Sequence, residues 1–205
     1  MTITGSHSVL PVRLRRGVLV AVLTTFLAGC GVNNIPTFEE QAKAAWSQVE
    51  NQYQRRADLI PNLVETVKGA ANFERETLQA VIEARSKVAQ TTIPPNVLTN
   101  PEAFKTYEQN QAALTSALSR LLVVVERYPD LKANQNYLSL QSQLEGTENR
   151  IAVARRDYIE AVRKYNTELR TFPGRLWAMT LYSGSQPMQN FTIAEDLSRA
   201  PTVKF

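Results

Sequence analysis

Apolar side chains recur every three or four residues between Phe38 and Ile82. That spacing places them on one face of an α-helix, whereas in a β-strand alternate residues would share a face. An apolar helix face must pack against another element, so the stripe predicts a helical bundle. The stripe consists of Phe38, Ala42, Trp46, Val49, Tyr53, Ile60, Leu63, Val67, Leu78, Val81 and Ile82.

Capping residues and prolines predict where the helices begin and end. Thr37 and Glu40 have the spacing of a capping box, so the first helix is predicted to begin at Phe38. Pro61 lacks an N–H and is expected to kink this helix into two stacked segments. The predicted elements are residues 38–60, 61–90, 101–127, 131–169 and a short helix at 175–182.

The fold class that follows is all-α. We expect an elongated antiparallel bundle of three long helices, with the first one kinked at Pro61, plus a short C-terminal helix. The alternation typical of strands is absent from the sequence. The predicted regions are a signal peptide at 1–29, a lipidated tether at 30–37, the bundle at 38–182, and a loop and tail at 183–205.

Charged residues interrupt two of the apolar stripes. The third predicted helix has the alternating four- and three-residue steps of a coiled-coil seam, but Glu148 and Arg155 occupy seam positions. Arg56 does the same in the first helix, close to Arg55 and Asp58. Because an unpaired buried ion costs several kcal/mol, we expect an ion-pair layer that sets helix register. Glu148 should pair with an arginine of the first helix or with Arg155; a ligand pocket at the same layer is the alternative.

The only cysteine, Cys30, ends a segment typical of an export signal. Three arginines precede an apolar run of 13 residues, which is shorter than the roughly 20 that a membrane-spanning helix needs. The run ends in Leu27, Ala28 and Gly29, so the segment Leu27–Cys30 is similar to the lipobox of bacterial lipoproteins. We predict cleavage before Cys30 and acylation of its thiol, with palmitate-type chains. An uncleaved membrane helix that extends to Val32 is the alternative.

A lipidated Cys30 would tether the protein to the membrane on the non-cytoplasmic side of the cell envelope. In a Gram-negative lipoprotein, an aspartate directly after the cysteine would argue for retention in the inner membrane. Gly31 stands there instead, which leaves the outer membrane as the default expectation.

The composition includes few of the residue types that enzymes commonly use for catalysis. His7 is the only histidine and precedes Cys30, so a mature chain would contain neither a histidine nor a free thiol. All 19 acidic residues but only 20 of the 23 basic ones follow Cys30, so the mature chain is close to neutral. We therefore expect no nucleic-acid partner, no metal site, no cofactor and no enzymatic activity.

Several ordered blocks of sequence resemble the LemA family. The resemblance implies a membrane-anchored helical bundle of bacteria, outside the cytoplasm, but it implies no reaction. Many members have a plain N-terminal membrane helix, whereas this chain has a lipobox-like segment. The matching blocks are Trp46–Val64, Val67–Gly69, Glu74–Glu76, Glu145–Ile151, Arg155–Tyr158, Tyr165–Asn166, Phe172–Pro173 and Pro201–Phe205.

Together these features predict a non-enzymatic scaffold or adaptor that is anchored in the envelope and binds an envelope protein. The alternative is a binding protein for a small envelope ligand, which would use the polar layer around Arg56 and Glu148. An envelope enzyme is the weakest of the three hypotheses. Self-association is a further expectation, because long apolar-striped helices pack readily against identical copies.

Overall fold

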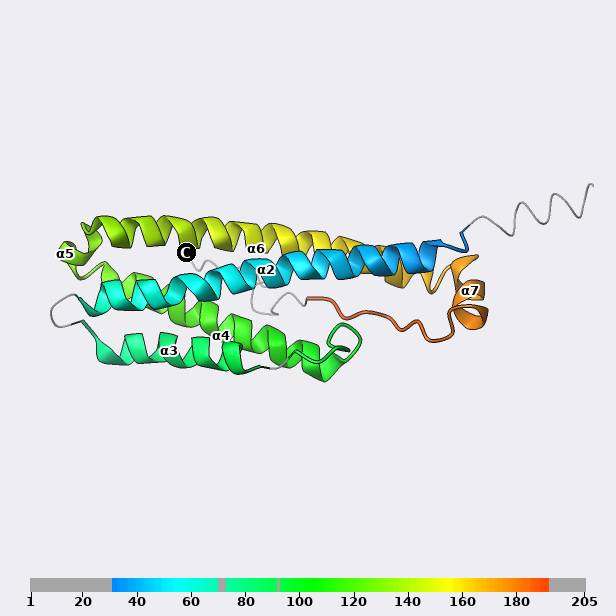
Figure 1. Ribbon diagram of the computed structural model, residues 1–205, viewed down its shortest axis with the longest axis horizontal. Helices are drawn as coiled ribbons and strands as arrows, with labels where there is room; N and C mark the ends of the chain where they lie inside the picture. Colours follow the sequence, from blue (N-terminus) through cyan, green and yellow to red (C-terminus); the bar gives the residue numbers. More distant parts are fainter. Residues whose placement is uncertain (1–30, 70–72, 92, 192–205) are drawn as a thin grey trace, which may run out of the picture.

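The computed structural model describes residues 31–69, 73–91 and 93–191, which form an elongated helical bundle (Figure 1). No strand occurs among these residues, so the predicted all-α fold class is confirmed. The helices are α2 (Asn34–Lys68), α3 (Arg75–Gln90), α4 (Pro101–Val125), α5 (Pro129–Lys132), α6 (Gln135–Glu168) and α7 (Gly174–Thr180).

The bundle is built from two helix pairs. The long helices α2 and α6 run side by side in opposite directions, and α3 pairs with α4 beneath them (Figure 1). The short α5 connects α4 to α6 at one end of the bundle. Helix α7 lies at the opposite end, where α2 begins.

The predicted division of the first helix at Pro61, into segments 38–60 and 61–90, is wrong. Helix α2 continues through Pro61 and ends at Lys68, and α3 then returns along the bundle to pack on α4. A proline inside a helix costs about 3 kcal/mol, but burial of one large aliphatic side chain contributes about 1.5–3 kcal/mol. Ile60 and Leu63 flank Pro61 and are both fully buried, so their packing offsets the cost of the proline. The helix stops instead at Gly69, which has poor helix propensity.

The predicted start of the first helix is also wrong. Helix α2 begins at Asn34, so Thr37 lies within the helix, and the 34–37 part of the predicted tether is helical. Tertiary contacts hold this extra turn. Ile35 is fully buried, and the Asn34 side chain donates a hydrogen bond to Glu168 Oε1 at 3.1 Å.

The remaining boundaries lie close to their predictions, with one division. The predicted third helix is split into α5 and α6, because the Asn134 side chain accepts hydrogen bonds from the backbone N–H groups of Asn136 and Tyr137 and so starts a new helix. Helix α4 ends at Val125, two residues before its predicted end. Helix α7 occupies Gly174–Thr180, close to the region predicted as a short helix.

Two hydrophobic clusters fill the bundle, one toward each end. The cluster near α7 is rich in aromatic rings. Trp46 is its centre, with ring centroids of Phe104, Tyr107, Tyr158 and Phe191 between 5.2 and 6.1 Å away. The cluster near α5 is mostly aliphatic. Every member of the predicted stripe from Ala42 to Val81 is buried; Phe38 is half-buried and Ile82 is 37% exposed.

Candidate functional site

A buried arginine lies between the two hydrophobic clusters. Arg56 comes from the middle of α2 and is only 1% exposed. Its Nη1 donates to Glu148 Oε1 on α6 at 2.8 Å and to Thr115 Oγ1 on α4 at 2.7 Å. The prediction that Glu148 pairs with an arginine of the first helix is therefore confirmed.

The second guanidinium nitrogen of Arg56 binds α4 as well. Nη2 donates to Gln111 Oε1 at 2.6 Å, and the backbone oxygen of Gln111 lies 3.4 Å away. The ring of Tyr53 lies 5.0 Å from the guanidinium carbon, close enough for a cation–π contact. Arg56 thus connects α2, α4 and α6 at one level, and we call Arg56, Gln111, Thr115 and Glu148 the polar layer.

Three of the five residues predicted for this layer lie elsewhere. Arg55 and Asp58 are exposed on α2, and Asp58 accepts a hydrogen bond from Gln54 at 2.7 Å. Neighbours one or two positions apart on a helix point in different directions, which explains why only Arg56 reaches the interior. Arg155 lies farther along α6, over the ring of Phe191 at 4.3 Å and 3.6 Å from Glu108.

Sequence reasoning missed Gln111 and Thr115. A signal for Gln111 was present, because it occupies a position in the apolar stripe of α4. The buried residues of α4 are Phe104, Tyr107, Gln111, Leu114, Leu118, Leu121, Val124 and Val125. A polar residue at a stripe position needs a partner inside the bundle, as Arg56 does.

A groove of about 380 Å³ runs between α4 and α6 beside the polar layer. The Glu148 side chain is 40% exposed, so this carboxylate reaches both Arg56 and the groove. The walls combine carboxylates, hydroxyls and leucines, which suits a cation that carries an apolar body. The lining residues are Thr115, Leu118, Ser119, Leu122, Leu144, Glu145, Glu148 and Asn149.

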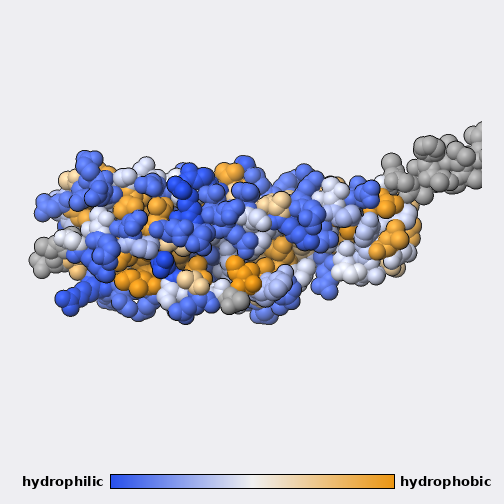
Figure 2. Space-filling view, in the orientation of Figure 1, coloured by the Kyte–Doolittle hydropathy of each residue, from blue (hydrophilic) through white to orange (hydrophobic). Residues whose placement is uncertain are grey.

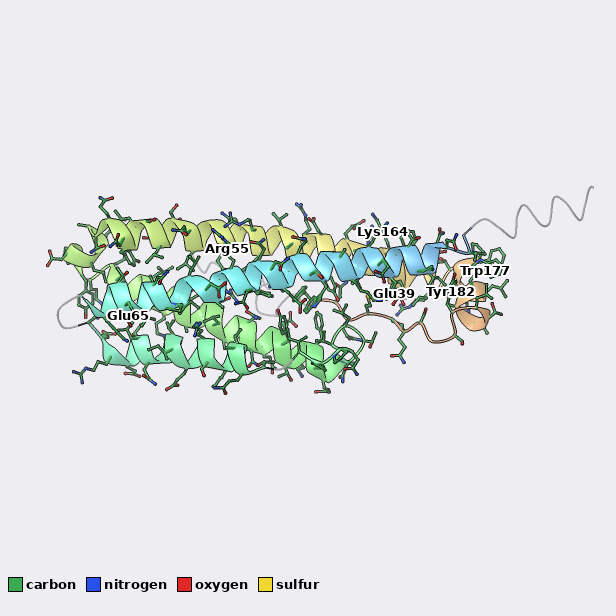
Figure 3. The ribbon with its side chains drawn as sticks, viewed as in Figure 1. Glu39, Arg55, Glu65, Lys164, Trp177 and Tyr182 are labelled. Carbon is green, nitrogen blue, oxygen red and sulfur yellow. The ribbon has the colours of Figure 1, made fainter. Side chains whose placement is uncertain are left out.

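A second hollow, of about 520 Å³, lies near the α7 end, where Figure 3 labels Glu39 and Tyr182. Its charges are already paired. Lys43 contacts Glu39 at 2.8 Å and Glu40 at 3.1 Å, and these hydrogen bonds raise the pKa of Lys43. No group of side chains suited to hold a metal ion occurs in the described part of the chain.

Residues Leu27, Ala28, Gly29 and Cys30 lie outside the described residues, so the predicted cleavage and acylation site is not placed in this structure. Within the described ranges, no helix has the length and hydropathy needed to cross a membrane.

Comparison with known families identifies the bundle. The family described as LemA family matches residues 45–205. This chain belongs to the LemA family. The match covers α2 from Ala45 onward and all the helices that follow, including every residue of the polar layer. The resemblance inferred from the sequence blocks is therefore confirmed.

Curated relatives share about a quarter of their aligned residues with this LemA-family chain. Protein LemA of Metamycoplasma hominis is 26% identical over 140 residues, which are 68% of this chain and 60% of the relative. Magnetosome protein MamQ of Magnetospirillum gryphiswaldense is 27% identical over 177 residues, 78% of this chain and 64% of the relative. Magnetosome protein MamQ 2 of Paramagnetospirillum magneticum is 26% identical over 171 residues, which are 76% of this chain and 62% of the relative. The chain thus spans about three fifths of the length of these relatives.

Proposed function

We propose that this LemA-family protein is a lipid-anchored, non-enzymatic scaffold or adaptor of the cell envelope. Cys30 is its anchor, on the non-cytoplasmic side of the membrane, and the helical bundle is the part that meets an envelope protein. In a Gram-negative cell the membrane is the outer one.

The observation that carries this proposal is the way in which the buried Arg56 is hydrogen-bonded within the bundle. It is the only charged residue buried among the described residues, and it directs its terminal nitrogens to Glu148, Gln111 and Thr115. Buried charges that serve catalysis are aimed at a substrate site, whereas buried charges that set register are satisfied by the fold. Both terminal nitrogens of Arg56 are bonded to the protein in this second way, and only its buried Nε has no hydrogen-bond partner, which supports a structural role for the polar layer.

The first test is the intact mass and membrane fractionation of the full-length protein and of Cys30→Ala. We expect an acylated chain that begins at Cys30, and loss of this mass and of membrane attachment in the variant. Asn33→Ala is the matched control, because Asn33 is exposed and makes no capping bond. An unprocessed Cys30→Ala chain that stays in the membrane would favour the uncleaved membrane helix formed by the apolar run before Cys30.

The adaptor role is tested by cross-linking in the intact envelope. The exposed Val123 on α4 is 72% accessible, and Glu65 lies at the α5 end of α2 (Figure 3). A photo-reactive residue at either position should join the bundle to one defined protein at a fixed ratio. The same product should be absent when the probe replaces the buried Leu114. Recovery of no defined product from any exposed position counts against an adaptor.

The groove beside Glu148 favours a second candidate function, a binding protein for a small cationic ligand. Spermidine is a suitable probe because it combines ammonium groups with methylene segments, and its binding can be measured by calorimetry. Glu145→Gln removes one carboxylate from the groove without touching Arg56, and should weaken binding at least threefold.

Glu83→Gln is the matched control for this experiment. Glu83 on α3 accepts from Gln79 four residues before it, as Glu145 on α6 accepts from Gln141. Equal binding by both variants and the unmodified protein would eliminate the groove as the binding site.

A further inference from the structure

The end of the bundle at α7 exposes a dense group of large apolar side chains. Met179 is 70% exposed and Phe172 is 85% exposed. Single exposed apolar residues are normal on a soluble surface, but four within ten residues call for a partner. We call this group the end patch; its members are Phe172, Leu176, Met179 and Leu181. Figure 2 shows apolar side chains at this end of the molecule.

The chain enters the bundle beside the end patch. A Cβ on Gly31 would lie 3.4 Å from Pro173 Cγ, one residue after Phe172. Asn34 then bonds to Glu168, just before α7. One residue spans at most about 3.6 Å, so an anchor at Cys30 emerges next to the end patch. The same holds whether the anchor is an acylated cysteine or an uncleaved helix.

The charge of this segment suits a membrane surface. Residues 169–191 include two arginines, Arg170 and Arg175, and no aspartate or glutamate. Both arginines are exposed. Their cationic heads can reach anionic headgroups while their stems lie along the apolar boundary. Trp177, which Figure 3 places on α7, is half-buried and belongs to a residue type that is enriched at membrane interfaces.

A second copy of the chain is a poorer fit for the end patch. One side of a stable protein interface buries about 800 Å², and four partly covered side chains on and beside a seven-residue helix provide much less. Contact with a bilayer does not require so large a buried area, because the anchor already holds the protein at the membrane surface.

We propose that the end patch inserts into the headgroup region of the bilayer that holds the anchor, so that the long axis of the bundle stands away from the membrane. The proposal rests on the anchor of the proposed function only for its position at residue 30, not for its chemistry. Gly174 supports the required position of α7, because a Cβ there would overlap the backbone oxygen of Glu168. In this orientation α5 and the polar layer face away from the membrane, toward soluble partners.

Tryptophan quenching in vesicles tests the insertion. Full-length protein is reconstituted in vesicles of phosphatidylethanolamine and phosphatidylglycerol whose acyl chains carry bromine near the headgroup. Trp46 is only 5% exposed and lies in the aromatic cluster, so quenching should come from Trp177 and disappear in Trp177→Phe. The double variant Met179→Glu, Leu181→Glu should reduce the quenching at least twofold.

The double variant Val123→Glu, Val153→Glu is the matched control. It places the same charges at exposed apolar positions on the sides of the bundle and should keep the quenching of the unmodified protein. Thermal melting followed by circular dichroism checks that all variants are folded. Equal quenching in the two double variants, or none in the unmodified protein, would overturn the proposal.

Three further outcomes separate this inference from a dimer and from the proposed lipid anchor. If sedimentation shows a dimer that only the end-patch variant dissociates, the patch binds a second copy and the bilayer proposal is wrong. If Cys30 carries a lipid but Trp177 is not quenched, the lipid anchor is supported and only the proposed insertion of the end patch is wrong. If Trp177 is quenched without acylation of Cys30, insertion of the end patch is supported and the proposed lipid anchor is wrong.

Discussion

Arg56 and Glu148 form an ion pair in which the two partners are unequally buried. The Nη1 to Oε1 distance is 2.8 Å, and the arginine side chain is 1% exposed whereas the glutamate side chain is 40% exposed. The two possible deletions therefore have different consequences for the residue that remains. Without Glu148, a buried cation remains; without Arg56, the remaining carboxylate can turn to water.

This asymmetry predicts the order of two substitutions. Glu148→Ala leaves Arg56 charged inside the bundle and should lower the free energy of unfolding by about 3 kcal/mol. Arg56→Met removes the buried charge and fills its space, so it should cost only about 1–2 kcal/mol, mainly for the unsatisfied Gln111 amide. Urea denaturation of the two variants measures both values. A larger loss for Arg56→Met would contradict the asymmetry.

Glu50 should make stability depend on pH in the opposite direction from most glutamates. Burial raises the pKa of Glu50, and a hydrogen bond from the Trp46 side chain opposes that shift. The folded state thus binds the proton more tightly than the unfolded state does. The contribution of this proton to the stability of the folded state is complete below the ordinary glutamate pKa of 4.5. It is lost as the pH rises through the raised pKa of Glu50.

Glu50→Gln should accordingly be more stable than the unmodified protein at pH 7.5, with the difference disappearing at pH 3.5. Thermal unfolding at the two pH values measures it. Glu160→Gln serves as a control of opposite sign, because the hydrogen bond from Arg163 lowers the pKa of Glu160. A Glu50→Gln variant that is less stable than the unmodified protein at neutral pH would refute the prediction.

Two asparagines that precede helices should respond differently to alanine. The Asn100 side chain accepts from the backbone N–H groups of Glu102 and Ala103 at the start of α4, so Asn100→Ala should cost about 1 kcal/mol. Asn33 precedes α2 but makes no side-chain cap, and Asn33→Ala should leave stability unchanged. Chemical denaturation of both variants checks the difference, and equal losses would show that capping is not the cause.

Asn166 should control the segment that follows α7. Its side chain donates to the Met188 oxygen at 2.8 Å and accepts from the Met188 N–H at 2.9 Å. Asn166→Ala removes both bonds and should cost about 1–2 kcal/mol, with faster hydrogen exchange at residues 183–191. The exposed Asn149 on the same helix provides the control Asn149→Ala. Unchanged exchange at Met188 would mean that other contacts hold the segment, namely the hydrogen bond from the Tyr158 hydroxyl to the Gln189 oxygen and the packing of Phe191.

The buried faces of the helices could be predicted from the sequence because helical periodicity is a local property. Trp46, Val49 and Tyr53 were placed on the inner face from spacing alone, and they are buried. The requirement that a charge on that face find a partner also follows from local position and the cost of an unpaired ion. It predicted that Glu148 pairs either with an arginine of the first helix or with Arg155, and the structure contains the first of these pairs.

The path of the chain was decided by tertiary structure. Pro61 is the stronger helix breaker in isolation, yet α2 continues through it and ends at Gly69, because Ile60 and Leu63 pack in the core. Which seam charges become buried was decided in the same way. Arg56 meets Gln111 and Thr115 from α4, whereas Arg155 meets Glu108 and the ring of Phe191. Periodicity assigns a residue to a face, but its partners come from other helices, and their positions are set by packing of the whole bundle.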